Sequence, residues 1–152
     1  MIPLLIFEIG NKHYAVHLED VVKVFHAVAV CPLPGAPDVV SGIINMHGDI
    51  IPVLDIRKRL KIKEKSISIH DSFVLLKTKS RSFCIIVDSV DKSIDVSEDD
   101  IKVKDSIWPG LTIIDKIVSV TGEIILINNI ENYFLPGEEE ILDNSISVYN
   151  NK

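Results

Sequence analysis

Residues 39–57 have the sequence Val-Val-Ser-Gly-Ile-Ile-Asn-Met-His-Gly-Asp-Ile-Ile-Pro-Val-Leu-Asp-Ile-Arg, which is the most informative part of the chain. Apolar residues run up to His47-Gly48-Asp49 and resume directly after it, which is typical of a tight hairpin connection. The pattern predicts a β-hairpin with strands over 43–46 and 50–54. Gly42, at the start of the first strand, indicates a close backbone approach, made either by the chain's own packing or by a partner.

The segments on either side of this hairpin are also informative. Pro32, Pro34 and Pro37 fix their own φ and hold the residues before them extended, so residues 31–36 cannot form a helix. Residues 28–30 are predicted to form a short strand that enters this proline loop. After the hairpin, Asp55 is expected to cap a brief helix that ends at Leu60. The polar segment 61–66, within a connector at 61–71, is interpreted as the connection between two subdomains.

The rest of the chain repeats short apolar runs separated by turn residues. Three more hairpins are predicted: 4–9 with 12–16, 73–76 with 82–87, and 113–120 with 123–127. The apolar spacing within 17–25 predicts about two turns of helix. Ser97 is expected to cap an acidic helical turn over 98–100, and residues 130–135 one closing turn.

Many short strands joined by Gly and Pro turns are typical of all-β proteins. We therefore predict two small five-stranded β-barrel subdomains that pack together, with short helical turns, in a single domain over residues 1–137. The segment 138–152 is acidic and then rich in Asn and Ser. It is expected to be a flexible tail, docked at best through Ile141 and Leu142.

Composition narrows the function. The chain has 152 residues, 47% of them hydrophobic, a formal net charge of −6 and a pI near 5.3. The acidic balance opposes binding to nucleic acid and to anionic lipid. No apolar run approaches the roughly 18 residues of a membrane span, and the first residues lack the basic start of a signal peptide. We expect a cytoplasmic protein that does not insert into membranes, with Cys31 and Cys84 reduced.

The sequence holds no constellation of catalytic residues. It contains no Gly-rich phosphate loop and no Ser-His-Asp order, so a binding module without cofactor is favoured over an enzyme. One alternative is a metal or small-ligand site on a β-barrel: His13 and His17 lie four apart on a predicted strand, with Glu19 nearby. No further ligand is indicated there, and spaced histidines are common on barrel surfaces.

Four stretches together resemble the CheW family of bacterial chemosensory adaptors: Pro34-Gly-Ala-Pro37, Val40-Ser-Gly-Ile-Ile-Asn-Met-His-Gly48, Ile51-Pro-Val-Leu-Asp-Ile-Arg57 and Ile85-Ile-Val-Asp-Ser-Val90. The resemblance extends over residues 5–134. It implies two intertwined five-stranded barrels of the SH3-like kind, no enzymatic activity, and a scaffold role. The implied partners are the cytoplasmic tip of a chemoreceptor and the regulatory domain of a CheA-type histidine kinase. The alternative that the chain is an adaptor of a chemosensory pathway that controls pili or gene expression stays open.

The resemblance also implies which residues bind partners. They fall on a segment toward the kinase, on the central hairpin, and on a strand region that lines the groove between the barrels: Val21, Lys23, Gly42, Asn45, His47, Gly48, Ile86 and Val90. The chain departs from the family at two of them, because His47 stands where Arg is usual and Lys23 where an acidic residue is common. Two further departures lie in the closing hairpin: Asn128-Asn129 where Asp is usual, and Lys116 where Gly is usual.

Overall fold

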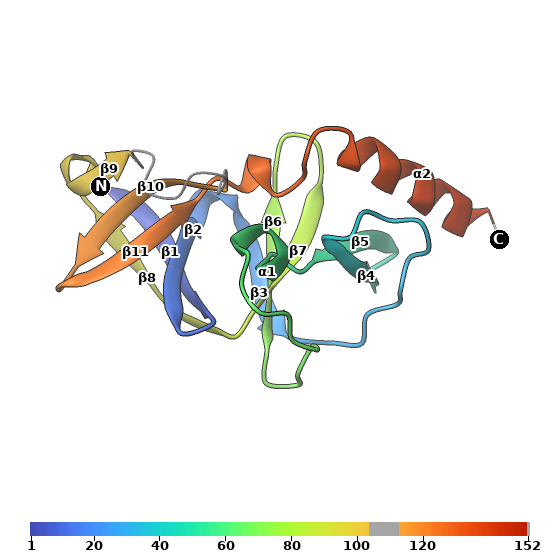
Figure 1. Ribbon diagram of the computed structural model, residues 1–152, viewed down its shortest axis with the longest axis horizontal. Helices are drawn as coiled ribbons and strands as arrows, with labels where there is room; N and C mark the ends of the chain where they lie inside the picture. The colour runs from blue at the N-terminus through green and yellow to red at the C-terminus, as the bar shows by residue number, and fades with distance from the viewer. Residues whose placement is uncertain (104–112, 152) are drawn as a thin grey trace.

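A computed structural model describes residues 1–103 and 113–151, and in it the strands form two sheets that lie side by side (Figure 1). The first sheet has six strands in the order β8-β1-β2-β11-β10-β9. These strands are β1 (Ile2–Ile9), β2 (Lys12–His17), β8 (Ser89–Val96), β9 (Ile101–Val103), β10 (Ile114–Val120) and β11 (Glu123–Asn128). The second sheet has five strands in the order β3-β6-β7-β5-β4. They are β3 (Val21–His26), β4 (Val40–Met46), β5 (Asp49–Leu54), β6 (Ser72–Lys77) and β7 (Ser82–Val87).

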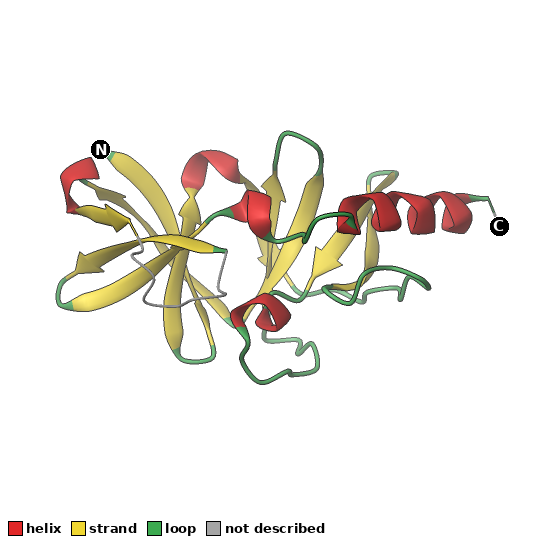
Figure 2. Cartoon of the chain, turned by 45° about the horizontal axis from the view of Figure 1, so that its top comes forward, coloured by secondary structure: helices red, strands yellow, loops and turns green. Residues whose placement is uncertain are grey.

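Helical structure is short except at the C-terminus (Figure 2). The helices are η1 (Leu18–Asp20), α1 (Arg57–Leu60), η2 (Glu98–Asp100), η3 (Ile130–Asn132) and α2 (Glu138–Asn150). The prediction of an all-β fold in two subdomains is confirmed, as are the four hairpins and the caps at Asp55 and Ser97. The first sheet has one strand more than predicted. Strand β8 was missed because most of its residues are polar and exposed, so it shows no apolar alternation.

Alternate residues along the central strands enter different hydrophobic cores. In β1, Leu4 and Ile6 enter a small core inside the first sheet, whereas Leu5 and Phe7 enter a large central core. Strand β7 does the same in the second sheet, where Cys84 lies in a small inner core and its neighbours lie in the central one. Both sheets therefore bury both faces and share one apolar layer between them. Burial raises the pKa of the Cys84 thiol to about 12.

The chain passes between the two sheets at 17–21 and again at Asp88, not at 61–66. The interpretation of 61–66 as the subdomain connection is wrong, because β5, which precedes it, and β6, which follows it, both belong to the second sheet. The segment links β5 to strands of its own sheet, where β5 pairs in parallel with β7. Two parallel strands need a long crossover connection. The residues of 61–66 are mostly polar because this connection lies on the surface.

The helix predicted within 17–25 is largely wrong. Residues 18–20 form the single turn η1, and Val21 begins the strand β3, which pairs with β6. The apolar spacing fitted a helix, but β-branched valines favour a strand, and pairing with β6 supplies the hydrogen bonds that two isolated helical turns would lack.

The C-terminal segment is also more ordered than predicted, because it forms the helix α2 along the second sheet (Figure 1). Leu142 is fully buried in the central core. Arg59 forms an ion pair with Glu138 and Arg81 forms one with Asp143. The acidic first turn that indicated a solvated tail instead favours the helix N-terminus, where carboxylates oppose the helix dipole.

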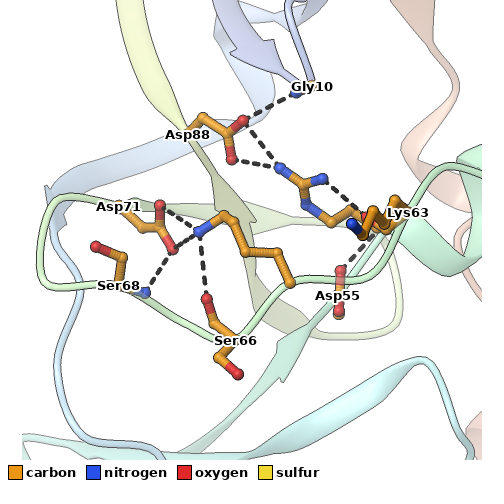
Figure 3. A network of polar contacts seen from close by, with 9 residues as sticks. Gly10, Asp55, Lys63, Ser66, Ser68, Asp71 and Asp88 are labelled. Atoms are coloured by element: carbon orange, nitrogen blue, oxygen red, sulfur yellow. Dashed lines mark hydrogen bonds and ion pairs between the residues drawn. The ribbon is translucent and has the colours of Figure 1, made fainter.

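One polar network ties the two sheets together (Figure 3). Asp88, at the crossing from β7 to β8, accepts a hydrogen bond from the backbone N–H of Gly10 at 2.9 Å, in the β1–β2 turn. Its carboxylate also receives the Arg57 guanidinium of α1 at 2.7 and 2.9 Å, and Arg57 donates to the carbonyl of Lys63 at 2.9 Å. Burial opposes ionisation of Asp88, but the Gly10 amide and Arg57 outweigh it, so the pKa of Asp88 is lowered.

We predict that Asp88→Asn lowers the free energy of unfolding by about 2 kcal/mol, because the largely buried Arg57 loses its counter-charge. A carboxyl whose pKa is lowered on folding stabilises the protein above its ordinary value of 3.8 and loses that effect as the pH falls below it. Urea unfolding should therefore show the difference at pH 7 and its decline below about pH 4. Asp95→Asn, at an exposed residue of β8, is the control. A difference that is independent of pH would contradict the assignment.

Candidate partner-binding site

Strand β3 forms one edge of the second sheet and carries two of the predicted site residues. Val21 is half-buried against the central core, and Lys23 is exposed. The Lys23 ammonium lies 5.9 Å from the centre of the Phe25 ring. Val22 and Val24 on the same strand are 57% and 39% exposed. This edge therefore presents apolar side chains around one positive charge, and edge lysines of this kind also discourage nonspecific strand pairing.

Three more of the predicted site residues lie at the turn between β4 and β5. His47 and Gly48 have positive φ of 53° and 94°, as a two-residue hairpin turn requires. The side-chain oxygen of Asn45 accepts a hydrogen bond from the Gly48 N–H at 2.9 Å. The imidazole of His47 is exposed at the tip. Asn45 thus stabilises the turn, and His47 is the residue that the turn presents to solvent.

Gly42 lies under the chain's own backbone. A Cβ at this position would lie 2.3 Å from the carbonyl oxygen of Cys31 and 2.6 Å from a methyl carbon of Val30. Cys31 and Ile43 exchange backbone hydrogen bonds of 2.9 and 2.8 Å across this contact. Of the two explanations that the sequence left open, close internal packing accounts for the glycine. Residues 30–31 cover Gly42, and its contact with a partner stays a prediction.

We predict that Gly42→Ala lowers the free energy of unfolding by about 2 kcal/mol, because the added methyl group overlaps a backbone that cannot move freely. Gly48→Ala is the comparison, since nothing lies within 4 Å of its Cβ position and only its positive φ is strained. Thermal unfolding should show the larger loss for Gly42→Ala. A Gly42→Ala protein of unchanged stability that fails to bind partners would contradict this structural role.

The last two predicted residues lie on either side of the crossing at Asp88. Ile86, in β7, is half-buried against the inner core of the second sheet. Val90, in β8, is half-buried against the central core and pairs with Phe7. The structure therefore does not gather the eight residues into one patch. They lie at the β3 edge, at the β4 edge with its turn, and at the junction of the two sheets.

The closing-hairpin departures have internal roles. Asn128 is 2% exposed, and its amide N–H donates to the hydroxyl of Tyr133 at 2.8 Å. Asn129 accepts from the backbone N–H of Glu131 at 3.1 Å and so caps η3. Lys116 is half-buried in β10 just after a bulge. Asn128 and Asn129 therefore stabilise the end of the first sheet.

The histidines of the alternative metal site do not converge. Four residues along a strand separate His13 and His17 by about 13 Å. His13 instead lies between Glu8 and Glu123, as an ion pair across β1, β2 and β11 when it is protonated. Within residues 1–103 and 113–151, no group of three or more His, Cys, Asp or Glu side chains is placed to hold a metal ion.

Sequence reasoning missed three features of the site. The exposed valines of β3 were expected on a helix, and an apolar groove beside residues 27–30 was not foreseen. The third is the pair of Arg57 and Asp88, which both lie in the stretches that carry the family resemblance. A charged residue at the end of a buried apolar run, as in Ile-Val-Asp, was the available signal.

These features define a small β-rich binding module whose exposed edges are held on one rigid body. The family model of the CheW-like domain matches residues 3–134, and the chain belongs to this family. The chain is 29% identical over 112 residues to the chemotaxis protein CheW of Treponema pallidum, covering 71% of this chain and 66% of that protein. It is 26% identical over 138 residues to the CheW of Rhizobium meliloti, covering 90% and 88%.

A solved structure has the same fold. The scaffolding protein TtCheW from Thermoanaerobacter tengcongensis superimposes with a TM-score of 0.83 at 24% identity, over 90% of this chain and 94% of that one. In the part of the chain that the structure describes, none of the helices is both long and apolar enough to cross a membrane.

Proposed function

We propose that this chain is a non-catalytic chemotaxis adaptor that couples the cytoplasmic tip of a chemoreceptor to the regulatory domain of a CheA-type histidine kinase in the cytoplasm. The observation that supports it most is the match to the CheW-like domain over residues 3–134, in a chain whose described residues gather no metal cluster. The two sheets share one core, so partners bound at different edges would be held in a fixed relative geometry.

Within this proposal, the exposed residues contact partners and the buried ones support them. Lys23, with the exposed valines of β3, forms the kinase-binding edge. His47 and Gly48 form a second contact at the β4–β5 turn. Val21, Ile86 and Val90 are half-buried and position these edges through the cores beneath them. Gly42 and Asn45 fix the backbone of the hairpin.

The charges on these edges define the partner chemistry. An ammonium at Lys23, next to exposed valines, fits a partner surface that is apolar with a carboxylate opposite Lys23. An imidazole at His47 is a weaker and less permanent donor than a guanidinium. A kinase whose surface suits an acidic residue at position 23 should therefore bind this chain less well than its own kinase does.

Charge reversal tests the two exposed contacts. Lys23→Glu is predicted to weaken binding to the cognate kinase regulatory domain about tenfold, which corresponds to about 1.4 kcal/mol. His47→Glu should weaken binding to the kinase domain or to the receptor tip to a similar degree, without unfolding the protein. Isothermal titration calorimetry on the purified pairs gives both values.

Matched controls exist for both variants. Lys92→Glu reverses an exposed charge on β8, and His70→Glu replaces an exposed histidine in a loop. Both controls should bind the partners like the unmodified chain. Equal affinities for Lys23→Glu and Lys92→Glu would remove β3 from the kinase interface, and an unchanged affinity of His47→Glu for both partners would remove the turn.

A further inference from the structure

An open apolar groove lies beside the point where β3 ends. Its cavity volume is about 510 Å³, and its walls are the segments 27–30 and 67–69, neither of which belongs to a strand. The side chains of Val28 and Ile69 are 48% and 83% exposed, although both are apolar. Contiguous exposed apolar side chains that line a hollow are typical of interaction sites.

The backbone along this groove is unpaired. Ala27 donates to the carbonyl of Asp71 at 3.0 Å, and Cys31 pairs with Ile43, but neither the N–H nor the C=O groups of residues 28–30 find a partner in the part of the chain described. The same holds for Ile67 and Ile69 on the opposite wall. Backbone with free donors and acceptors can pair with one further strand, and the side chains that line a groove select which strand binds.

The wall formed by 67–69 is held in place by its own polar contacts (Figure 3). Asp71 is 3% exposed. Its carboxylate accepts hydrogen bonds from the Lys65 ammonium at 2.8 Å and from the Ser68 N–H at 2.8 Å. Asp71 N–H donates to the Ser68 carbonyl at 3.0 Å. The loop that exposes Ile67 and Ile69 is therefore fixed before any partner arrives, which lowers the entropic cost of binding.

Charge identifies the occupant. The residues that line this groove carry no charge, whereas each of the other four hollows described on the surface is lined by at least one charged side chain. In a chain of net charge −6, an uncharged groove does not repel an apolar segment and offers nothing to a charged one. Exposed apolar walls and free backbone groups together suit an extended peptide.

We propose that the groove between residues 27–30 and 67–69 binds an extended, uncharged apolar peptide segment of a partner protein, which pairs with the backbone of 28–30 as an added strand. This inference does not rest on the adaptor role, because neither Lys23 nor His47 lines the groove. Alternate side chains of the bound segment would contact Val28, Val30, Ile67 and Ile69, and the others would face solvent.

The test is selection from a random-peptide display library on the full-length protein. We expect enriched peptides that are apolar and uncharged, and whose affinity falls roughly tenfold on Ile69→Lys protein. Ile69 is so exposed that this change leaves the fold intact. Ile124→Lys, at a 60% exposed isoleucine on β11, is the matched control and should bind the same peptides normally. Amide hydrogen exchange should slow at residues 28–30 when peptide is bound.

Four results would overturn the proposal. The first is that no enriched peptide distinguishes Ile69→Lys from Ile124→Lys, and the second is that bound peptides protect amides elsewhere. A concentration-dependent dimer that Ile69→Lys abolishes would mean that a second copy of this chain occupies the groove. Reduced binding of the kinase domain or receptor tip to the Ile69→Lys protein would make the groove part of the adaptor surface. Unchanged binding of both is the result that we expect.

Discussion

The structure depends on one apolar layer that two sheets share. Alternate side chains of β1 and β7 point into this layer and into the inner core of their own sheet. Both faces of each sheet are therefore buried around these strands. Separating the subdomains would expose Phe7 on one side and Phe83 on the other, both fully buried. At about 25 cal/mol for each Å² of apolar surface exposed, such a separation is strongly opposed. The two sheets must fold and move as one body.

This constraint explains where polar interactions are placed. The Arg57 to Asp88 pair bridges the sheets at the crossing, where a turn of the first sheet, a strand end of the second and α1 meet. Arg59 and Arg81 then attach α2 to the second sheet, and Leu142 extends the shared core beneath it. The exposed side chains of the edge strand β3 and of the β4–β5 turn are left for the partner contacts that we propose. A rigid body with several binding edges suits a scaffold, which acts by fixing the geometry of what it binds.

Much of this fold could be predicted because hairpin turns leave local signatures. His47-Gly48 and Thr121-Gly122 mark their turns by a glycine, which tolerates positive φ. What failed depended on partners distant in sequence. Residues 21–25 have the apolar spacing of a helix and become a strand only because β6 pairs with them. Strand β8 is mostly polar, so only its pairing with β1 defines it.

The site was predictable only in part for the same reason. Exposure of Lys23 and His47 followed from a resemblance and from turn chemistry. The glycine at position 42 indicated a close backbone approach, but no local pattern identifies Cys31 as the residue that makes it. The groove at 27–30 arises where two unpaired segments meet. Its only sequence signal was the isoleucines of Ser66-Ile-Ser-Ile-His70 in an otherwise polar connector.

In the proposed role, this one chain holds two partners at once. Sedimentation of the chain mixed with the kinase regulatory domain and the receptor tip measures this. We expect a complex that contains one copy of each, with receptor affinity undiminished when the kinase domain is saturating. If each partner displaces the other, or if neither binds the well-folded chain, the chain is not an adaptor of this kind.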